Sequence, residues 1–446
     1  MAEKIGFVSL GCPKNQVDGE RMLAQLEDAG MQIVDALTDG ADAVIVNTCG
    51  FIDSAKQESI NAVLEMAQLK DEGKVGKIIV VGCMAQKYRT EILEQFPEAD
   101  AVAGLGAAGD IVTLARSVLK NDALAHTAQD DSSPEALPLT GKRLLTTPEH
   151  WAYLKIADGC SNRCAYCAIP SIRGPFRSVP MEEVLLEARG LVEGGVRELI
   201  LIAQDTTSYG LDIYGELRLT NLLRALCKID ELHWIRLLYC YPDRVTPELL
   251  SVMASEPKII HYMDLPLQHI SDSVLTRINR RGSSADIRHV LAEIRTAMPD
   301  IALRTTFITG LPGESEADFE ELHSFIKEQK FERLGVFAYS PQEGTPAAEM
   351  PDQAPEELAE ERLDILMRTQ NDIARANAEL MVGKILEVVC EDYDGYTDMN
   401  IGRSHLDAPE IDACVYFSGN ARDGEYYSVK ILGVSDDGYD LVGKIV

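Results

Sequence analysis

The stretch GCSNRCAYCAIPSIRG, residues 159–174, places three cysteines close together. Cys160, Cys164 and Cys167 form a C-x3-C-x2-C array with no fourth cysteine beside it. A [4Fe–4S] cube has four irons, which proteins usually bind through four thiolates, so three thiolates leave one iron open. The array therefore predicts a cluster that can take an exchangeable ligand. The alternative is a zinc site, which would need a nearby fourth ligand, and neither a second C-x2-C pair nor a paired histidine follows.

An open iron can chelate a small molecule through an amino nitrogen and a carboxylate, as S-adenosylmethionine (SAM) requires for reductive cleavage to a 5′-deoxyadenosyl radical. The cysteine spacing, with the aromatic Tyr166 directly before the last cysteine, resembles the signature of the radical SAM superfamily. This resemblance implies that SAM binds beside the cluster.

Six apolar segments alternate with helical stretches in this part of the sequence, one before the cysteine loop and five after it. They suggest an incomplete TIM-like (β/α)6 barrel, as in radical SAM enzymes, whose functional residues lie at the C-terminal ends of the strands. The cysteine loop follows the first segment, as that rule requires. The expected strands are residues 153–156, 198–202, 235–239, 262–267, 303–308 and 334–339.

Polar residues and glycines follow several of these strands. By resemblance, they line the SAM and substrate pocket together with Tyr166. A Gly-Leu-Pro-Gly segment is also an ordinary turn, so the last three positions have a purely structural alternative. The expected cofactor-binding residues are Tyr166, Gln204, Asp205, Gln268, Gly310, Gly313 and Glu314. No catalytic residue is assigned beyond the cluster ligands.

The N-terminal third alternates short apolar strands with helices, which predicts a parallel α/β sheet. Cys12, Cys49 and Cys83 each follow one of the expected strands, at residues 5–10, 43–47 and 77–81. Strand ends in a parallel sheet share one edge, where ligands bind, so three distant cysteines can converge there. The alternative for each cysteine is a small buried hydrophobe. Because all three occupy the same position, the pattern favours a second cluster.

Three N-terminal motifs carry a family resemblance: S-L-G-C-P-K-N at residues 9–15, N-T-C-G-F-I at 47–52, and Gly82-Cys83. They resemble the N-terminal domain of the methylthiotransferases, and residues 155–174 resemble the radical SAM core of that family. The resemblance covers essentially the whole chain. It implies two [4Fe–4S] clusters, each held by three cysteines: Cys12, Cys49 and Cys83 for one, and Cys160, Cys164 and Cys167 for the other.

The C-terminal part begins with a helix at about residues 355–380 and then becomes strand-rich, with turn signals such as Asp394-Gly395. Short strands with such turns predict a small antiparallel β-barrel, which resembles a TRAM domain, an OB-like module. Between these parts, the polar segment 121–149 reads as a linker. The expected domains are residues 1–120, 150–380 and 381–446. His126 and His150, in or beside the linker, are expected to be solvated.

The chain has 446 residues and a formal net charge of −30, a balance that repels nucleic acid and favours a basic partner. The same balance can also serve only to keep a protein soluble. Residues 383–446 hold 13 acidic and 5 basic residues, whereas an RNA-binding module should be basic. With no signal-peptide pattern and no apolar run of membrane-spanning length, the protein is expected in the cytoplasm, where thiols stay reduced.

The motif P-L-Q-H at residues 266–269 resembles the branch of the family that modifies ribosomal protein S12 rather than tRNA. The implied reaction replaces a C–H bond on the β-carbon of an aspartate by C–S–CH3, with SAM as both radical source and methyl donor. It also requires a sulfur source and an electron donor. Two alternatives remain at this stage. One is the same chemistry on a tRNA base, and the other is a non-catalytic iron–sulfur sensor.

Overall fold

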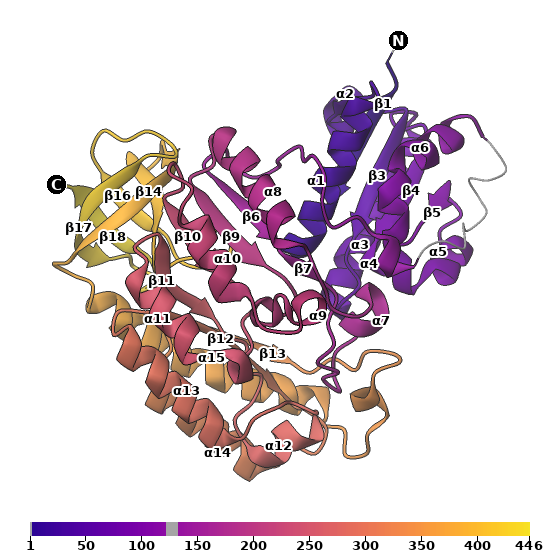
Figure 1. Ribbon diagram of the computed structural model, residues 1–446. Helices are drawn as coiled ribbons and strands as arrows, with labels where there is room; N and C mark the ends of the chain where they lie inside the picture. The colour runs from indigo at the N-terminus through magenta and orange to yellow at the C-terminus, as the bar shows by residue number, and fades with distance from the viewer. Residues whose placement is uncertain (1, 122–132) are drawn as a thin grey trace.

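The computed structural model describes residues 2–121 and 133–446, which form three parts in chain order (Figure 1). A parallel α/β sheet comes first, a six-stranded partial barrel follows, and a closed five-stranded barrel ends the chain. The predicted multidomain α/β fold class is therefore confirmed. None of the helices in the described ranges is long and apolar enough to cross a membrane.

The N-terminal sheet is fully parallel, with the strand order β2-β1-β3-β4-β5. Strands β3 and β4 are buried along their whole length, as expected for a parallel sheet with both faces covered. Strand β2 is not predicted from the sequence, because three residues give too short a periodic signal. The strands are β1 (Lys4–Ser9), β2 (Gln32–Val34), β3 (Ala43–Thr48), β4 (Ile78–Gly82) and β5 (Ala101–Val102).

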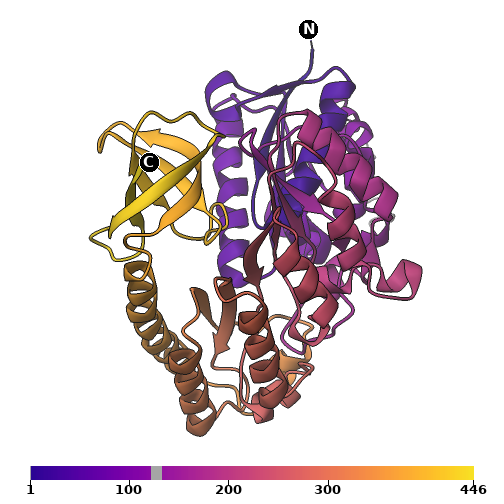
Figure 2. The ribbon, with the colours of Figure 1, turned by 60° about the vertical axis from the view of Figure 1, so that its left-hand side comes forward.

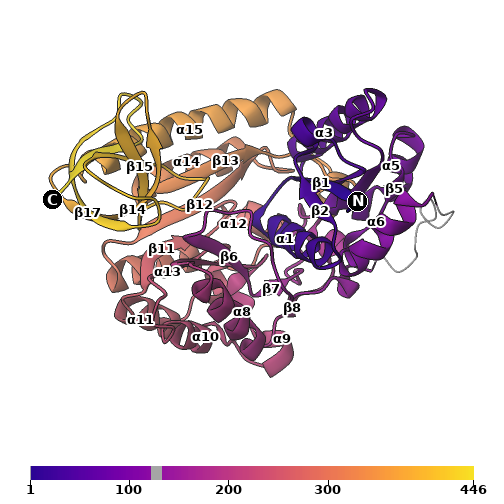
Figure 3. The same ribbon diagram turned by 90° about the horizontal axis from the view of Figure 1, so that it is seen from above.

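Helices connect these strands and cover the sheet. The first helix begins at Pro13, because proline is favoured in the first turn of a helix. Seen from above, this helix lies beside the central barrel (Figure 3). The helices are α1 (Pro13–Asp28), α2 (Ala36–Asp39), α3 (Asp53–Asp71), α4 (Cys83–Lys87), α5 (Arg89–Gln95), the 3-10 helix η1 (Leu105–Asp110) and α6 (Ile111–Leu119).

The central sheet is also parallel, and its strands follow the order of the chain, β6-β9-β10-β11-β12-β13. This arrangement is the predicted six-stranded partial barrel. A short antiparallel ribbon of β7 (Ala157–Asp158) and β8 (Arg177–Ser178), not foreseen from the sequence, closes the neck of the cysteine loop. The six strands are β6 (Trp151–Lys155), β9 (Glu198–Ile202), β10 (Trp234–Leu237), β11 (Ile259–Asp264), β12 (Ala302–Thr309) and β13 (Arg333–Ala338).

Most helices of the central part pack on the outside of this curved sheet, whereas α7 (Ile169–Arg173) and the 3-10 helix η3 (Pro134–Ala136) pack against the N-terminal domain (Figure 1). The others are α8 (Met181–Glu193), α9 (Leu211–Tyr214), α10 (Leu219–Leu226), α11 (Pro247–Ser255), α12 (Asp272–Arg277), α13 (Ser284–Ala297), α14 (Glu316–Gln329) and α15 (Glu356–Glu379), with the 3-10 helices η4 (Thr206–Ser208), η5 (Pro242–Arg244) and η6 (Pro346–Glu349). The long helix α15 then leads out of the barrel into the C-terminal part (Figure 2).

The C-terminal part is a closed barrel in the order β14-β15-β16-β18-β17. The expectation of a purely antiparallel barrel is wrong at one place, because β16 and β18 pair in parallel. The intervening strand β17 pairs with β14 and β18 instead of β16, so β18 lies between β16 and β17 and the barrel closes through the β14–β17 pair. The strands are β14 (Ile385–Asp394), β15 (Met399–Ser404), β16 (Val415–Ser418), β17 (Tyr426–Val434) and β18 (Leu441–Ile445).

The segment expected to be a linker is anchored at its C-terminal end. Arg143 has a side chain that is only 2% exposed, and it pairs with Glu20 of α1 and Glu187 of α8. His150 is buried beside Glu391 of β14, so the expectation that it is solvated is wrong. His126 lies outside the described residues. The N-terminal domain therefore docks on the barrel through buried ion pairs that the segment itself supplies.

Candidate functional site

Three cysteines meet at the C-terminal edge of the N-terminal sheet. Cys12 caps α1, Cys49 directly follows β3, and Cys83 is the first residue of α4. A Cβ atom on Gly11 would lie 2.5 Å from the Cβ atom of Cys49, which shows how closely the loops approach. The three thiols are near enough to influence one another electrostatically. The parallel sheet thus brings together cysteines that are far apart in sequence.

The electrostatics of these thiols are uneven. Burial raises the pKa of Cys83 to about 12, although the Arg173 guanidinium opposes this shift. Burial likewise raises the pKa of Cys49, and a thiolate on Cys12 adds to the increase. At Cys12 burial also acts upward, but the charges of Lys14 and Arg173, with backbone hydrogen bonds from Asn15 and Lys14, outweigh it, so the pKa is lowered. Three thiolates in this place need positive charge around them, which iron provides.

Arg173, from the central part of the chain, reaches into this N-terminal site. Its Nη2 donates to the sulfur of Cys83 at 3.3 Å, and its Nη1 donates to Asp18 of α1 and to Asp158 of β7, both at 2.9 Å. Lys155 of β6 pairs with the same two carboxylates. All four charged side chains are buried. This cluster therefore ties the cysteines of one domain to the cysteine loop of the next.

The second set of cysteines lies in the loop between β7 and α7. Cys160 follows Gly159, and its amide donates to the carbonyl of Gly174 at 3.1 Å, so the loop closes on itself. The amide of Cys167 donates to the carbonyl of Cys164 at 3.1 Å. Burial raises the pKa of Cys167 to about 12 and also raises the pKa of Cys160.

A second arginine contacts this second set. Arg280 donates from Nη1 to the sulfur of Cys164 at 3.6 Å, and its guanidinium lies 4.0 Å from the centre of the Tyr241 ring. Each set of three cysteines therefore has one arginine donating to a sulfur, and Arg173 is buried whereas Arg280 is partly buried. Hydrogen bonds to cluster sulfurs are a known means of tuning iron–sulfur centres.

The donor sets fit iron–sulfur clusters. All ten cysteines are free, and the remaining four, Cys227, Cys240, Cys390 and Cys414, have other neighbours. Within residues 2–121 and 133–446, no three His, Cys, Asp or Glu side chains are arranged around a single metal ion. A cube binds each thiolate to a different iron, so its ligands need not converge on one point. Each set supplies three thiols and a cation, which suits a cluster with one open iron.

Three of the expected SAM contacts gather around the cysteine loop. The hydroxyl of Tyr166 accepts from Arg280 at 3.3 Å. Gln204 donates to Asp158 at 2.9 Å and keeps a buried carbonyl oxygen without a hydrogen-bond partner in the described structure. Asp205 accepts from Asn162 of the loop at 2.7 Å and pairs with Arg244. The structure therefore places these three side chains at the second cysteine set.

The other expected contacts have different surroundings. Gln268 follows β11 with a left-handed backbone (φ 73°), and its main chain pairs with β12. A Cβ atom on Gly310 would lie 2.3 Å from the Cβ of Ala359, and Glu314 accepts from Arg362, so both face α15. Gly313 packs on Arg277 in the same way. The backbone at Gly310 and Gly313 is therefore packed closely against residues of two helices of the protein itself.

Several charged residues of the site were not predicted: the buried Lys14, Asp18, Asp158 and Arg173, and the partly buried Arg280. Lys14 and Arg173 stand inside the quoted cysteine motifs, and this position was the available signal. A sequence does not say which charged residues are buried, because a charge on a short segment is usually solvated. Their role becomes visible only when the two domains are placed together.

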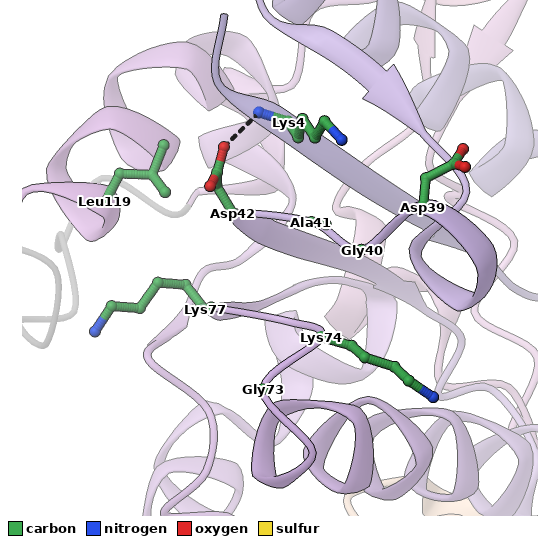
Figure 4. A pocket seen from close by; sticks show the side chains of 10 residues that line it. Lys4, Asp39, Gly40, Ala41, Asp42, Gly73, Lys74, Lys77 and Leu119 are labelled. Carbon is green, nitrogen blue, oxygen red and sulfur yellow. Dashed lines mark hydrogen bonds between the residues drawn. The ribbon is translucent and has the colours of Figure 1, made fainter. Parts of the chain in front are cut away.

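A hollow of about 410 Å³ opens at the opposite edge of the N-terminal sheet (Figure 4). It lies at the start of β1 and β3, whereas the cysteines lie at their ends. Its lining lysines Lys74 and Lys77 pair with Glu72 and Asp100, outside the hollow's own residues. The hollow therefore shares no residue with the cysteine sites.

Family models match all three parts of the chain. The match is to uncharacterized protein family UPF0004 at residues 4–104, to the radical SAM superfamily at residues 154–326, and to the TRAM domain at residues 382–446. The second match spans both the cysteine loop and most of the partial barrel.

Curated relatives match over the full length. The ribosomal protein uS12 methylthiotransferase RimO of Desulforamulus reducens is 48% identical, covering 99% of this chain and 99% of the relative. The protein of the same name from Geobacter sulfurreducens is 46% identical, covering 100% of this chain and 99% of the relative.

Solved structures share the fold at low identity. The radical S-adenosylmethionine methyltransferase TsrM from Kitasatospora setae, with cobalamin and a [4Fe–4S] cluster bound, aligns with a TM-score of 0.58 at 14% identity. The alignment covers 78% of this chain and 77% of that one. The cobalamin-dependent radical enzyme OxsB aligns with a TM-score of 0.51 at 12% identity, covering 83% and 56%.

Proposed function

Because this chain belongs to the ribosomal protein uS12 methylthiotransferase family, we propose that it methylthiolates the β-carbon of an aspartate in ribosomal protein S12. It is a radical SAM methylthiotransferase, which uses an iron–sulfur cluster and SAM. The proposal extends to two [4Fe–4S] clusters, one for each set of three cysteines, and to a cytoplasmic enzyme.

One observation carries the two-cluster proposal. Two sets of three free cysteines flank one buried domain interface, and Arg173 spans it from Cys83 to Asp158 beside the cysteine loop. An enzyme that must bring two reactive groups to one carbon needs its two centres on the same side of a shared space. The interface holds them in that relation through buried ion pairs, not through a mobile linker.

A C–H bond on an aspartate β-carbon is neither acidic nor electrophilic, so the bound clusters and SAM would supply the radical, the sulfur and the methyl group. The protein's own residues bind and orient these groups. Cys160, Cys164 and Cys167 would hold the cluster that cleaves SAM, and Arg280 would donate to one of its thiolates.

The remaining site residues would complete the SAM pocket. Tyr166, Gln204 and Asp205 surround the cysteine loop, and the buried Gln204 carbonyl oxygen is free to accept from a ligand. Gln268 would contribute from the end of β11. The loop between β12 and α14 would contribute indirectly, because its backbone conformation depends on Gly310, Gly313 and Glu314.

Modification of tRNA by the same chemistry is the second candidate, and the TRAM match is the observation that keeps it open. The acidic charge of residues 383–446 favours a basic protein over RNA.

The first experiment is therefore mass spectrometry after anaerobic reconstitution with iron, sulfide, SAM and a reductant. In that experiment, ribosomal protein S12 and bulk tRNA are offered in parallel. We expect a methylthio mass gain on one aspartate of S12 and unchanged tRNA. A gain on tRNA alone would retain the chemistry and overturn the substrate. If SAM is cleaved but neither substrate gains mass, the chain is a radical enzyme with a different target.

A further inference from the structure

Lys14 is a buried ammonium that makes no ion pair with a carboxylate in the described part of the chain. It is 6% exposed, and the other buried lysine in the described part of the chain, Lys155, pairs with both Asp18 and Asp158. Within residues 2–121 and 133–446, the Lys14 ammonium makes no ion pair or hydrogen bond. Its Nζ lies 3.0 Å from the centre of the Tyr239 ring. The ammonium therefore has the Cys12 thiolate as its nearest stabilising charge and makes no ion pair with a carboxylate.

The position of this ammonium is between the two domains. Lys14 is the second residue of α1 and follows Cys12 by two positions, whereas Tyr239 follows β10 at the C-terminal edge of the partial barrel. Tyr239 has a left-handed backbone (φ 60°), and its amide donates to Asp264 at 3.0 Å. The ring under the ammonium is thus fixed by the barrel, while the ammonium itself comes from the cysteine domain.

Removing an ammonium from water is unfavourable unless a charge or several hydrogen bonds replace the water. The face of an aromatic ring replaces only part of that stabilisation. The nearby acids are engaged elsewhere, since Asp264 binds Arg304 and the Tyr239 amide, and Asp158 binds Lys155 and Arg173. An incoming anion would complete the site.

We propose that Lys14 binds the carboxylate of the aspartate that is modified, an inference that rests on the proposed function. The β-carbon of an aspartate is one bond away from its carboxylate. Anchoring that carboxylate beside Cys12 and above Tyr239 therefore holds the reacting carbon at the interface that both cysteine sets flank. The site also selects an acidic residue from a substrate that is otherwise basic.

The test compares two peptides that carry the modified segment of ribosomal protein S12, one with the target aspartate and one with asparagine in its place. Binding to the cluster-loaded protein is measured for the wild type and for Lys14→Met and Lys14→Arg. Lys56→Met is the matched control, because the Lys56 ammonium also lies over a tyrosine ring, that of Tyr88, but pairs with Asp53. Iron content, SAM affinity and circular dichroism are recorded for every variant.

We expect the wild type and Lys56→Met to bind the aspartate peptide about tenfold to a hundredfold more tightly than the asparagine peptide, as for a charge-assisted hydrogen bond. Lys14→Met should bind both peptides equally and weakly, with unchanged iron and SAM affinity. Lys14→Arg should recover part of the preference because it keeps the charge.

The inference is overturned if Lys14→Met still prefers the aspartate peptide. It is also overturned if this variant loses iron, which would make Lys14 a counter-charge of the cluster. A third contrary result is a selective loss of SAM affinity, which would make SAM the source of the carboxylate. If the wild type modifies no S12 at all, the proposed function fails. A wild type that modifies S12 while Lys14→Met still prefers the aspartate peptide overturns the inference alone, so the two failures can be told apart.

Discussion

Adding a single methyl group at Gly11 should impair the N-terminal cysteine site and leave the second cysteine site functional. The φ of Gly11 is +91°, and a Cβ atom there would lie 2.5 Å from the Cβ and 2.9 Å from the sulfur of Cys49. The Gly11→Ala variant therefore perturbs the N-terminal cysteines without changing any ligand. The cysteine loop of the partial barrel is left untouched.

The magnitude follows from the contact distance. A separation of 2.5 Å is about 0.9 Å short of the 3.4 Å at which ordinary van der Waals contact begins, so Cys49 must move by that order. Metal–ligand distances tolerate about 0.2 Å. The left-handed backbone adds about 1–2 kcal/mol for any residue with a Cβ. The displacement of the ligand thus exceeds what a cluster accepts, although the fold can absorb the backbone strain.

The assay is iron and acid-labile sulfide content after reconstitution, together with SAM cleavage and S12 methylthiolation. Gly30→Ala is the matched control, because Gly30 also has a left-handed backbone (φ +83°) but nothing lies within 4 Å of a Cβ there. We expect Gly11→Ala to hold about half the iron of the wild type. It should still form 5′-deoxyadenosine and should make no methylthiolated product.

Gly30→Ala should keep full iron content and activity and lose only about 1–2 kcal/mol of stability. If Gly11→Ala keeps full iron and full methylthiolation, Cys49 is not a cluster ligand. If it loses SAM cleavage as well, the two sites are not independent, and the assignment of one cluster to each set is wrong.

Three further predictions follow from buried groups. Glu198→Gln leaves Arg236 and Arg403 without their shared carboxylate between the partial barrel and the C-terminal barrel, so urea denaturation should show a loss of about 3–5 kcal/mol; a loss below about 1 kcal/mol would contradict this. Burial lowers the pKa of His269 to about 4 from an ordinary 6.5, so the unfolded chain takes up the proton first. Stability should be complete above pH 6.5 and fall by about 3 kcal/mol by pH 4. Thermal melts of His269→Gln should show a smaller pH dependence, and an unchanged dependence would exclude His269 as its source. Replacing any one of the six cysteines assigned to the clusters by alanine should abolish the methylthio product in mass spectra, whereas Cys227→Ala should retain it. If one of the six variants still makes the product, the cysteine replaced in it is not a cluster ligand.

The arrangement of the cysteines could be predicted because each one is tied to a local pattern. Strands such as β3 and β4 are continuous apolar runs, and the cysteines stand directly at their ends. Parallel pairing then forces those ends to one edge. The same reasoning found the six strands of the partial barrel. It missed β2 and the β7–β8 ribbon, which are too short to show a period.

The domain interface could not be predicted, because its contacts join residues far apart in sequence. Arg173 and Asp18 are separated by most of the first domain and the linker, and neither has a pattern that marks it as buried. Arg143 stands in a polar segment that resembles a flexible connection, yet its side chain is enclosed by Glu20 and Glu187. The sequence shows that these residues are polar, but whether a charged side chain is buried and paired depends on which residues the folded chain brings next to it.

The acidic residues of the C-terminal barrel fall into two groups, buried ones paired with arginines and exposed ones in loops. The sequence gives only the combined number of the two groups. The buried group binds the partial barrel: Asp407 pairs with Arg333, and Asp412 pairs with Arg304. These carboxylates are buried and neutralised, so they attract no partner from solution. Other acids, such as Asp398 and Asp436, are exposed in loops between strands. A basic substrate protein would therefore contact the exposed loops of the barrel, and added salt would weaken that attraction. The buried ion pairs that hold the barrel in place would be screened much less by salt.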